Sequence, residues 1–103
     1  MMNQAQLMAQ MRKMQTEMAK AQEELAGTVV TGAAAGGSVK IEMTCDHRVK
    51  SISIAKEALD PENVEMLEDL LVIACNAALQ NVEETAQRRM GALTGGMRIP
   101  GLT

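Results

Sequence analysis

Cys45 and His47 are the pair of residues in this sequence whose types could support nucleophilic catalysis. Positions i and i+2 of a strand share one face, so a thiol and an imidazole at this spacing could form a dyad. The pair falls at an expected turn, however, and the sequence offers neither a third orienting residue nor an oxyanion loop. We therefore expect an ordinary turn histidine beside a half-exposed thiol, and we expect no enzymatic activity.

Two other groups of residues could hold a cation or a phosphate, and both lack the necessary context. Carboxylates in the first turns of an expected helix point in many directions, as a solvated face does; they are Glu62, Glu65, Glu68 and Asp69. The glycines within residues 32–37 lie between two expected strands, whereas a phosphate cradle needs a following helix. We expect no metal, no cofactor and no small-molecule substrate.

Six basic side chains could bind phosphates: Arg12, Lys13, Lys20, Arg88, Arg89 and Arg98. Lys13 and Lys20 are seven residues apart, which places them on one face of a helix. Glu17 lies within reach of both along that helix, and arginines suit the end of a helix, so purely structural roles are open to these residues. The residues by themselves do not separate DNA from a protein partner.

The element that must position the first three cations is a helix over residues 2–25. Apolar residues recur there at alternating spacings of four and three, which is the seam of a packed helix: Leu7, Met11, Met14, Met18, Ala21 and Leu25. Gly27 is an expected helix stop. The methionines can pack against helices of this chain or a second copy, or they can form an adaptable surface for several partners. Helical spacing favours core packing.

Residues 28–54 predict a three-stranded antiparallel meander. Residues 28–31 are rich in β-branched side chains, and residues 32–37 predict a loop of small residues. Residues 39–44 alternate apolar and polar side chains, which is typical of a half-buried strand. Residues 45–47 predict a turn, and residues 49–54 predict a strand with Ile52 and Ile54 on one face and Val49 on the other.

A long helix over residues 61–90 is expected to follow, with a flexible tail over residues 91–103. Asp60 suits the N-cap, Pro61 the first helical position, and Leu59 and Val64 a hydrophobic staple. Arginines followed by Gly91 suit the end of the helix. The sequence therefore predicts an α/β (α+β) chain, in the order helix, three-stranded sheet, long helix, as a single domain over residues 1–103.

The long helix has two different halves. Residues 70–75 are all apolar, and a helix that is apolar all round must be buried all round. Its later residues are almost wholly polar, so the helix is expected to begin in a core and to project into solvent. A chain this short can hardly surround the first half, so we expect an intertwined homodimer whose interface includes Leu67, Leu70, Leu71, Ile73, Ala74, Ala77 and Ala78.

Composition narrows the class of protein further. The chain of 103 residues has no aromatic residue, a net charge of −3 and two cysteines without metal-site spacing. Residues 57–87 carry a net charge of −8, whereas residues 31–56 carry +2 and residues 88–103 carry +3. An acidic chain is a poor generic ligand for nucleic acid, but its local basic surfaces remain possible sites. We expect a cytoplasmic protein with no membrane partner.

The sequence resembles the YbaB/EbfC nucleoid-associated proteins nearly from end to end. The segments that carry the resemblance are MLEDLLVIACNAALQNVEET, VKIEMTCDHRVKSISI, the ValThrGly before the small-residue loop, and the closing GlyGlyMetArgIleProGly. The most specific part runs from Leu67 to Asn76. The chain departs from the usual pattern at Cys75, where an aromatic residue is common.

The resemblance implies a bacterial homodimer with projecting, tweezer-like helices that binds double-stranded DNA in the nucleoid. It also implies that the DNA contacts lie on the projecting helices, at the six basic residues above. We therefore expect phosphate-led binding of duplex DNA and a role in nucleoid organisation or gene regulation. The alternative is a protein-interaction adaptor, with a recombination or chaperone-type partner, that uses the methionine-lined seam.

Overall fold

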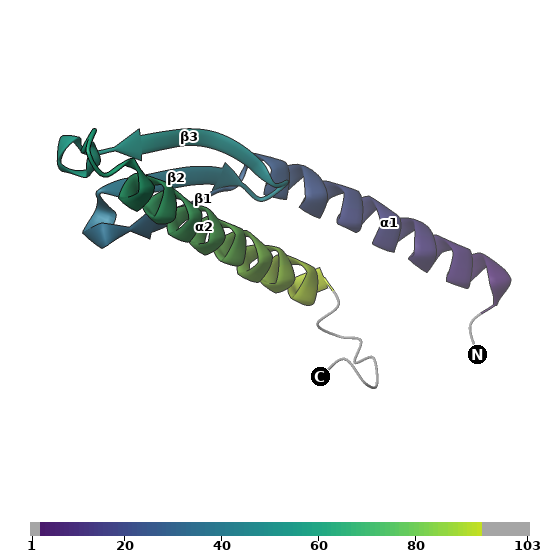
Figure 1. The fold of residues 1–103 in the computed structure, drawn as a ribbon. Coiled ribbons are helices and arrows are strands. Elements are labelled where there is room, and N and C mark those ends of the chain that lie inside the picture. Colours follow the sequence, from purple (N-terminus) through teal and green to yellow (C-terminus); the bar gives the residue numbers. More distant parts are fainter. Residues whose placement is uncertain (1–2, 94–103) are drawn as a thin grey trace, which may run out of the picture.

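The computed structural model describes residues 3–93, and it confirms the predicted order of helix, three-stranded antiparallel sheet and long helix. Figure 1 shows that the long helices α1 (Gln4–Gly27) and α2 (Val64–Leu93) run antiparallel and that their outer ends extend to the same side of the sheet. The expected tail over residues 91–103 lies largely outside the described residues.

Helix α1 begins with a reciprocal cap. The Gln6 amide donates to Asn3 Oδ1 at 2.8 Å, and the Asn3 amide donates to Gln6 Oε1 at 3.3 Å. These bonds satisfy two of the amides that the start of every helix leaves without a partner. The helix ends at Gly27, close to the predicted end, and its last turns bury Ala21 and Leu25.

Strand β1 (Val29–Ala34) is longer than predicted, because the expected loop over residues 32–37 is partly strand. Gly32 lies under α2, where an added Cβ would come closer than 3.0 Å to main-chain atoms of Ala74 and Ala78. The glycine is therefore needed for the close approach of the helix, and it does not break the strand. The turn that follows is the short helix η1 (Ala35–Gly37), in which Gly36 and Gly37 have positive φ.

Strands β2 (Val39–Thr44) and β3 (Arg48–Ile54) complete a sheet in the order β1-β2-β3. Ile41 lies opposite Ile52, and Met43 lies opposite Val49, with a register shift between these pairs. Lys50 is the additional residue of β3 at this bulge. Because opposed residues share a face, Val49 lies on the same face as Ile52, and the prediction that they lie on opposite faces was wrong.

Helix α2 begins and ends later than predicted. Asp60 and Pro61 belong to a turn, in which the Asn63 amide donates to Asp60 O at 3.0 Å. Asn63 is the residue that caps the helix, since its Oδ1 accepts from the Met66 amide at 3.3 Å. Gly91 lies inside the helix, which continues to Leu93. Asp60 and Asn63 are both of a type that caps helices, and the prediction that Asp60 is the N-cap was wrong.

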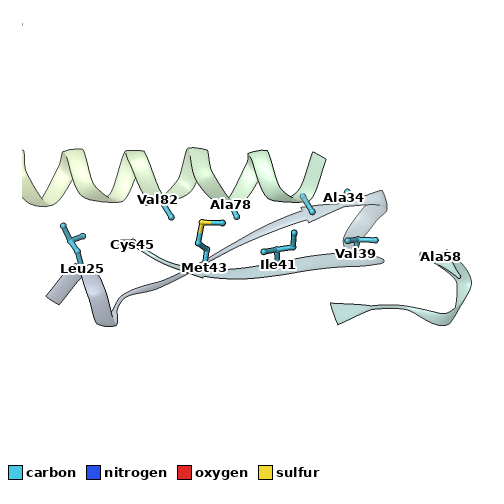
Figure 2. Packing of buried hydrophobic residues seen from close by; sticks show 10 residues of the cluster. Leu25, Ala34, Val39, Ile41, Met43, Cys45, Ala58, Ala78 and Val82 are labelled. Atoms are coloured by element: carbon cyan, nitrogen blue, oxygen red, sulfur yellow. The ribbon is translucent and has the colours of Figure 1, made fainter. Parts of the chain in front are cut away.

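The core lies between α2 and one face of the sheet. Figure 2 shows Ala78 and Val82 of α2 above Ile41 and Met43 of β2, with Leu25 of α1 at the end of the cluster. The alternation predicted for β2 is confirmed, because its three apolar side chains are buried. The opposite face of the sheet is polar, and there Ser51 Oγ donates to Glu42 Oε1 at 2.6 Å.

This chain leaves much of its apolar surface uncovered. Helix α2 packs on β1 and β2, and Ile52 of β3, on the same face, remains 53% exposed. Val72 and Ile73 of the apolar half of α2 are 58% and 53% exposed. The Cα radius of gyration is 19.6 Å, whereas a compact chain of this length would have a radius of about 13 Å. The single chain therefore does not bury this helix on every side.

Candidate nucleic-acid interface

Three of the predicted phosphate-binding residues lie on the exposed part of α1. Arg12, Lys13 and Lys20 are all exposed. At 100° per residue, these cations lie on the side of α1 away from Met18 and Leu25, which belong to the apolar seam. Lys20 lies four residues before Glu24 on the same flank of α1, and its charge contributes to the lowered pKa of Glu24. The structure thus brings these three predicted residues together on one helix.

The charges of these three residues are not neutralised by direct ion pairs. In the span from residue 3 to residue 93, the ion pairs are Arg48 with Asp46 and Arg89 with Glu24. Neither includes a cation of α1. Charge-assisted bonds to a phosphate are therefore open to Arg12, Lys13 and Lys20 without the loss of an existing pair.

Arg88 and Arg89 near the end of α2 have different surroundings. Arg88 is exposed, and its Nη2 donates to Thr85 Oγ1 at 3.3 Å within the same helix. Arg89 Nε donates to Glu24 Oε2 at 2.8 Å, which joins α2 to α1. This hydrogen bond and the arginine charge hold the pKa of Glu24 below its ordinary value. Arg98 lies outside the described residues.

Cys45 and His47 do not form the arrangement that a nucleophilic dyad requires. Cys45 is buried, and its amide donates to Thr28 O at 2.9 Å, whereas His47 is exposed and has a φ of 66° in the turn. Burial of the thiol, together with the charge of Asp46, raises the pKa of Cys45. A thiol with a raised pKa is a poor nucleophile, since the thiolate is the reactive form. The expectation of a half-exposed thiol was wrong.

The described residues contain no group of three or more potential metal ligands. Glu62, Glu65, Glu68 and Asp69, the acidic residues near the start of α2, are exposed. No helix among residues 3–93 combines the length and the apolar character that a membrane crossing needs.

The expected interface residues on α2 fall into two groups. Ala74 and Ala78 are fully buried within this chain against β1, so their side chains belong to its own core. The others are half-buried or exposed: Leu67, Leu70, Leu71, Ile73 and Ala77. Val72, Val49 and Ile52 are also exposed, and the sequence analysis did not name them for this interface. The exposure of Val72 could have been considered because it lies in the apolar run of residues 70–75. The face of Val49 could not be predicted, because the bulge in β3 changes it.

Residues 1–97 match the YbaB/EbfC DNA-binding family. The chain belongs to this family. Membership covers nearly the whole sequence, including both long helices and the sheet, and it confirms the resemblance carried by the residues of α2 and β2. The family is a DNA-binding one and not an enzymatic one, which agrees with the surroundings of Cys45.

Curated relatives support the same assignment for this YbaB/EbfC chain. A nucleoid-associated protein of Chloroflexus aurantiacus is 47% identical over 97 residues, which are 94% of this chain and 97% of the relative. A nucleoid-associated protein of Pelotomaculum thermopropionicum is 44% identical over 100 residues, which are 97% of this chain and 95% of the relative. The relatives are thus similar in length as well as in sequence.

A solved structure shows the same fold. The crystal structure of an uncharacterized protein from Helicobacter pylori matches with a TM-score of 0.80 at 23% identity, over 92% of this chain and 100% of that chain. At this identity the match concerns the fold alone, and it supports the arrangement of projecting helices and sheet.

Proposed function

We propose that this YbaB/EbfC chain binds double-stranded DNA as a homodimer, mainly through phosphates, and acts in nucleoid organisation or gene regulation. Family membership supports DNA as the ligand, and the relatives named nucleoid-associated proteins support the cellular role. The observation that carries the mode of binding is the set of exposed cations on α1, which have no ion-pair partner among the described residues: Arg12, Lys13 and Lys20.

Charge distribution gives the bound duplex an orientation. Residues 57–69, around the start of α2, carry a net charge of −6 and repel phosphates from that end of the protein. Figure 1 shows that α1 extends beyond the sheet, and Arg12 and Lys13 belong to the outer half of this helix, where a duplex can approach. Phosphate contacts position a protein on DNA but carry no sequence information directly, so we expect weak or indirect sequence preference.

A second copy of the chain is the proposed cover for the apolar surface of α2 and β3. Leu67, Leu70, Leu71, Ile73 and Ala77 form the expected part of this interface, and we add Val49, Ile52 and Val72. A small domain without aromatic residues gains stability by sharing a core, since its own core is limited. Twofold symmetry then doubles the number of arms that contact one duplex. The absence of aromatic residues opposes single-strand binding by base stacking.

An adaptor function is the second candidate, and the exposure of the α1 seam favours it. Leu7, Met11 and Met18 of this seam are between 41% and 56% exposed, and methionine-rich surfaces can bind several partners. A protein partner that remains bound at high salt after nuclease treatment would favour the adaptor. A partner that is lost under these conditions would have been held through DNA.

The proposed function is tested by fluorescence-anisotropy titration of a labelled random-sequence duplex at several salt concentrations. If about four phosphates are neutralised, log affinity falls with log salt with a slope near −3.6. The double variant Arg12→Glu/Lys13→Glu should bind all duplexes more weakly and should remain a dimer in sedimentation.

A matched control is Lys40→Glu/Lys50→Glu, which changes the net charge equally on the sheet and leaves the arms intact. It should bind nearly as the wild type does, apart from the general effect of net charge. Loss of binding in this control and not in the α1 variant would move the site to the sheet. Absence of binding by the wild type at low salt would overturn the proposal.

A further inference from the structure

The ion pair between Glu24 and Arg89 lies where the two long helices leave the body of the protein. Glu24 precedes Leu25, one of the buried residues of α1, and Arg89 follows Val82, the last fully buried residue of α2, by seven residues. Seven residues are two helical turns, so Arg89 lies on the same face of α2 as Val82. The guanidinium therefore points toward α1 and not toward the solvent side of α2.

This contact lies at the surface, where the side chains of Arg89 and Glu24 are 33% and 60% exposed. Arg89 Nε donates to Glu24 Oε2 at 2.8 Å, so the contact is both a hydrogen bond and an ion pair. It joins residues that are 65 positions apart in the sequence and lie on different helices. The hydrogen bond and the opposite charge raise the pKa of Arg89, and Glu17 of α1 adds to this effect.

The surroundings of Arg89 make it a poor phosphate contact. Glu24 occupies its Nε, and the carboxylate charge of Glu17 also acts on it. A phosphate that bound the remaining N–H groups of Arg89 would approach these two carboxylates, and like-charge approach is unfavourable. Arg88, the preceding residue, has no carboxylate partner in the described structure and keeps its charge available.

We propose that Arg89 is a positioning residue, which sets the separation of α1 and α2 through Glu24 and does not bind phosphate itself. The inference rests on the proposed DNA binding. The separation of the two helices matters there because cations on both helices must reach one duplex. At one particular separation of the helices, phosphates of the same duplex can bind cations of both α1 and α2. These cations are Arg12, Lys13 and Lys20 on α1 and Arg88 on α2. Release of the pair allows the helices to separate and lowers the affinity.

The proposal is tested on the full chain with Arg89→Ala, Glu24→Ala and the charge swap Glu24→Arg/Arg89→Glu. Arg88→Ala is the matched control, since it removes the same charge from the neighbouring position. Both Arg89→Ala and Glu24→Ala should weaken duplex binding about two- to fivefold with an unchanged salt slope. The charge swap should restore the affinity. Arg88→Ala should instead reduce the slope by about 0.9 for each phosphate lost.

A second measurement needs no DNA and separates this proposal from the proposed function. Spin labels on cysteines introduced at Gln10 and Gln87, in a Cys45→Ala/Cys75→Ala background diluted with unlabelled chain, report the distance between the helices. The distance distribution should broaden in both alanine variants and narrow again in the swap. Broadening with no DNA binding by the wild type would leave the positioning role and overturn the proposed function.

Two results would overturn the positioning role. The first is a smaller salt slope in Arg89→Ala together with an affinity of Glu24→Ala that equals or exceeds that of the wild type. This result would make Arg89 a phosphate contact. The second is a distance distribution that is the same in the wild type and in both alanine variants.

Discussion

Ile41 and Ile52 lie directly opposite each other in β2 and β3, but their exposed fractions are 1% and 53%. Helix α2 covers Ile41 but does not cover Ile52. Ile41 is therefore buried, whereas Ile52 is exposed to solvent. Such an asymmetry within one apolar face indicates that a further element belongs beside α2. In the proposed function, this element comes from a second copy of the chain.

The variant Ile52→Asp should therefore dissociate the proposed dimer and preserve the fold of the chain. A buried charge without a partner is strongly unfavourable in an interface, whereas an aspartate at this exposed site of the single chain is tolerated. We expect the dimer to weaken by about 2 kcal/mol or more, which is roughly a 30-fold change in dissociation constant. Sedimentation equilibrium measures this change, with circular dichroism as the test of folding.

The control for this variant is Ser53→Asp, which places the same charge on the polar face of the neighbouring position. Ser53 lies opposite Lys40, so the added carboxylate faces a cation. The control should remain a dimer. A folded Ile52→Asp chain that dimerises as well as the wild type does would contradict the proposed interface.

The contact between β1 and α2 gives a prediction about stability. Gly32→Ala should destabilise the chain by about 2–3 kcal/mol, because its Cβ would overlap main-chain atoms of Ala74 and Ala78 that cannot rotate away. Urea unfolding at one fixed protein concentration measures the change in the free energy of unfolding.

Gly27→Ala is the matched control for this prediction. An added Cβ at Gly27 has no neighbour within 4 Å, and the position is the end of α1. Since alanine favours helix over glycine, this variant should be neutral or more stable by up to about 1 kcal/mol. Equal destabilisation of both variants would show that loss of glycine flexibility, and not the close helix contact, is responsible.

Much of the fold could be predicted from the sequence, because the spacing of apolar residues indicates helices and strands. The alternation of residues 39–44 predicted which side chains of β2 are buried, and the apolar spacing of the first segment predicted α1. The boundaries depended on tertiary contacts. Gly32 resembled a loop residue by its type, and the position of α2 above it explains why it belongs to a strand. Asp60 and Asn63 are both good caps, and the path of the chain selects Asn63.

The candidate site was less predictable, because a basic residue type does not reveal its partner. Their charge and the family resemblance predicted Arg12, Lys13 and Lys20 as DNA contacts, and all three are exposed on α1. Arg89 was named for the same reason, but Glu24 is its partner across 65 positions of sequence. Helical spacing predicts which residues are neighbours within one helix, but it does not predict contacts between helices.

The Glu24–Arg89 pair also predicts how acid acts on the base of the arms. The pKa of Glu24 is lowered in the folded chain from an ordinary value of 4.5, first by the hydrogen bond from Arg89 and then by its charge. A lowered pKa means that the folded state favours the carboxylate. The stabilising effect is therefore present above about pH 4.5 and is lost as the pH falls through the lowered pKa.

A carboxyl titration by NMR measures this effect directly. Glu24 should titrate below 4.5, and the Arg89 Nε–H signal should shift with the same midpoint. Arg89→Ala should raise the Glu24 midpoint toward its ordinary value, whereas Arg88→Ala should leave it nearly unchanged. A midpoint that is the same in the wild type and in Arg89→Ala would mean that the pair does not persist in solution.

Cys45 predicts a loss of stability in alkali. Burial of its thiol, and then the charge of Asp46, raise its pKa above the ordinary value of 9.0 in the folded chain. A raised pKa means that the folded state favours the protonated thiol, so this contribution is complete below pH 9 and is lost as the pH rises through the raised pKa. The free energy of unfolding should fall more steeply above pH 9 in the wild type than in Cys45→Ala. Cys75→Ala, which keeps the buried thiol, should follow the wild type, and equal slopes for the wild type and Cys45→Ala would contradict the burial of the thiol.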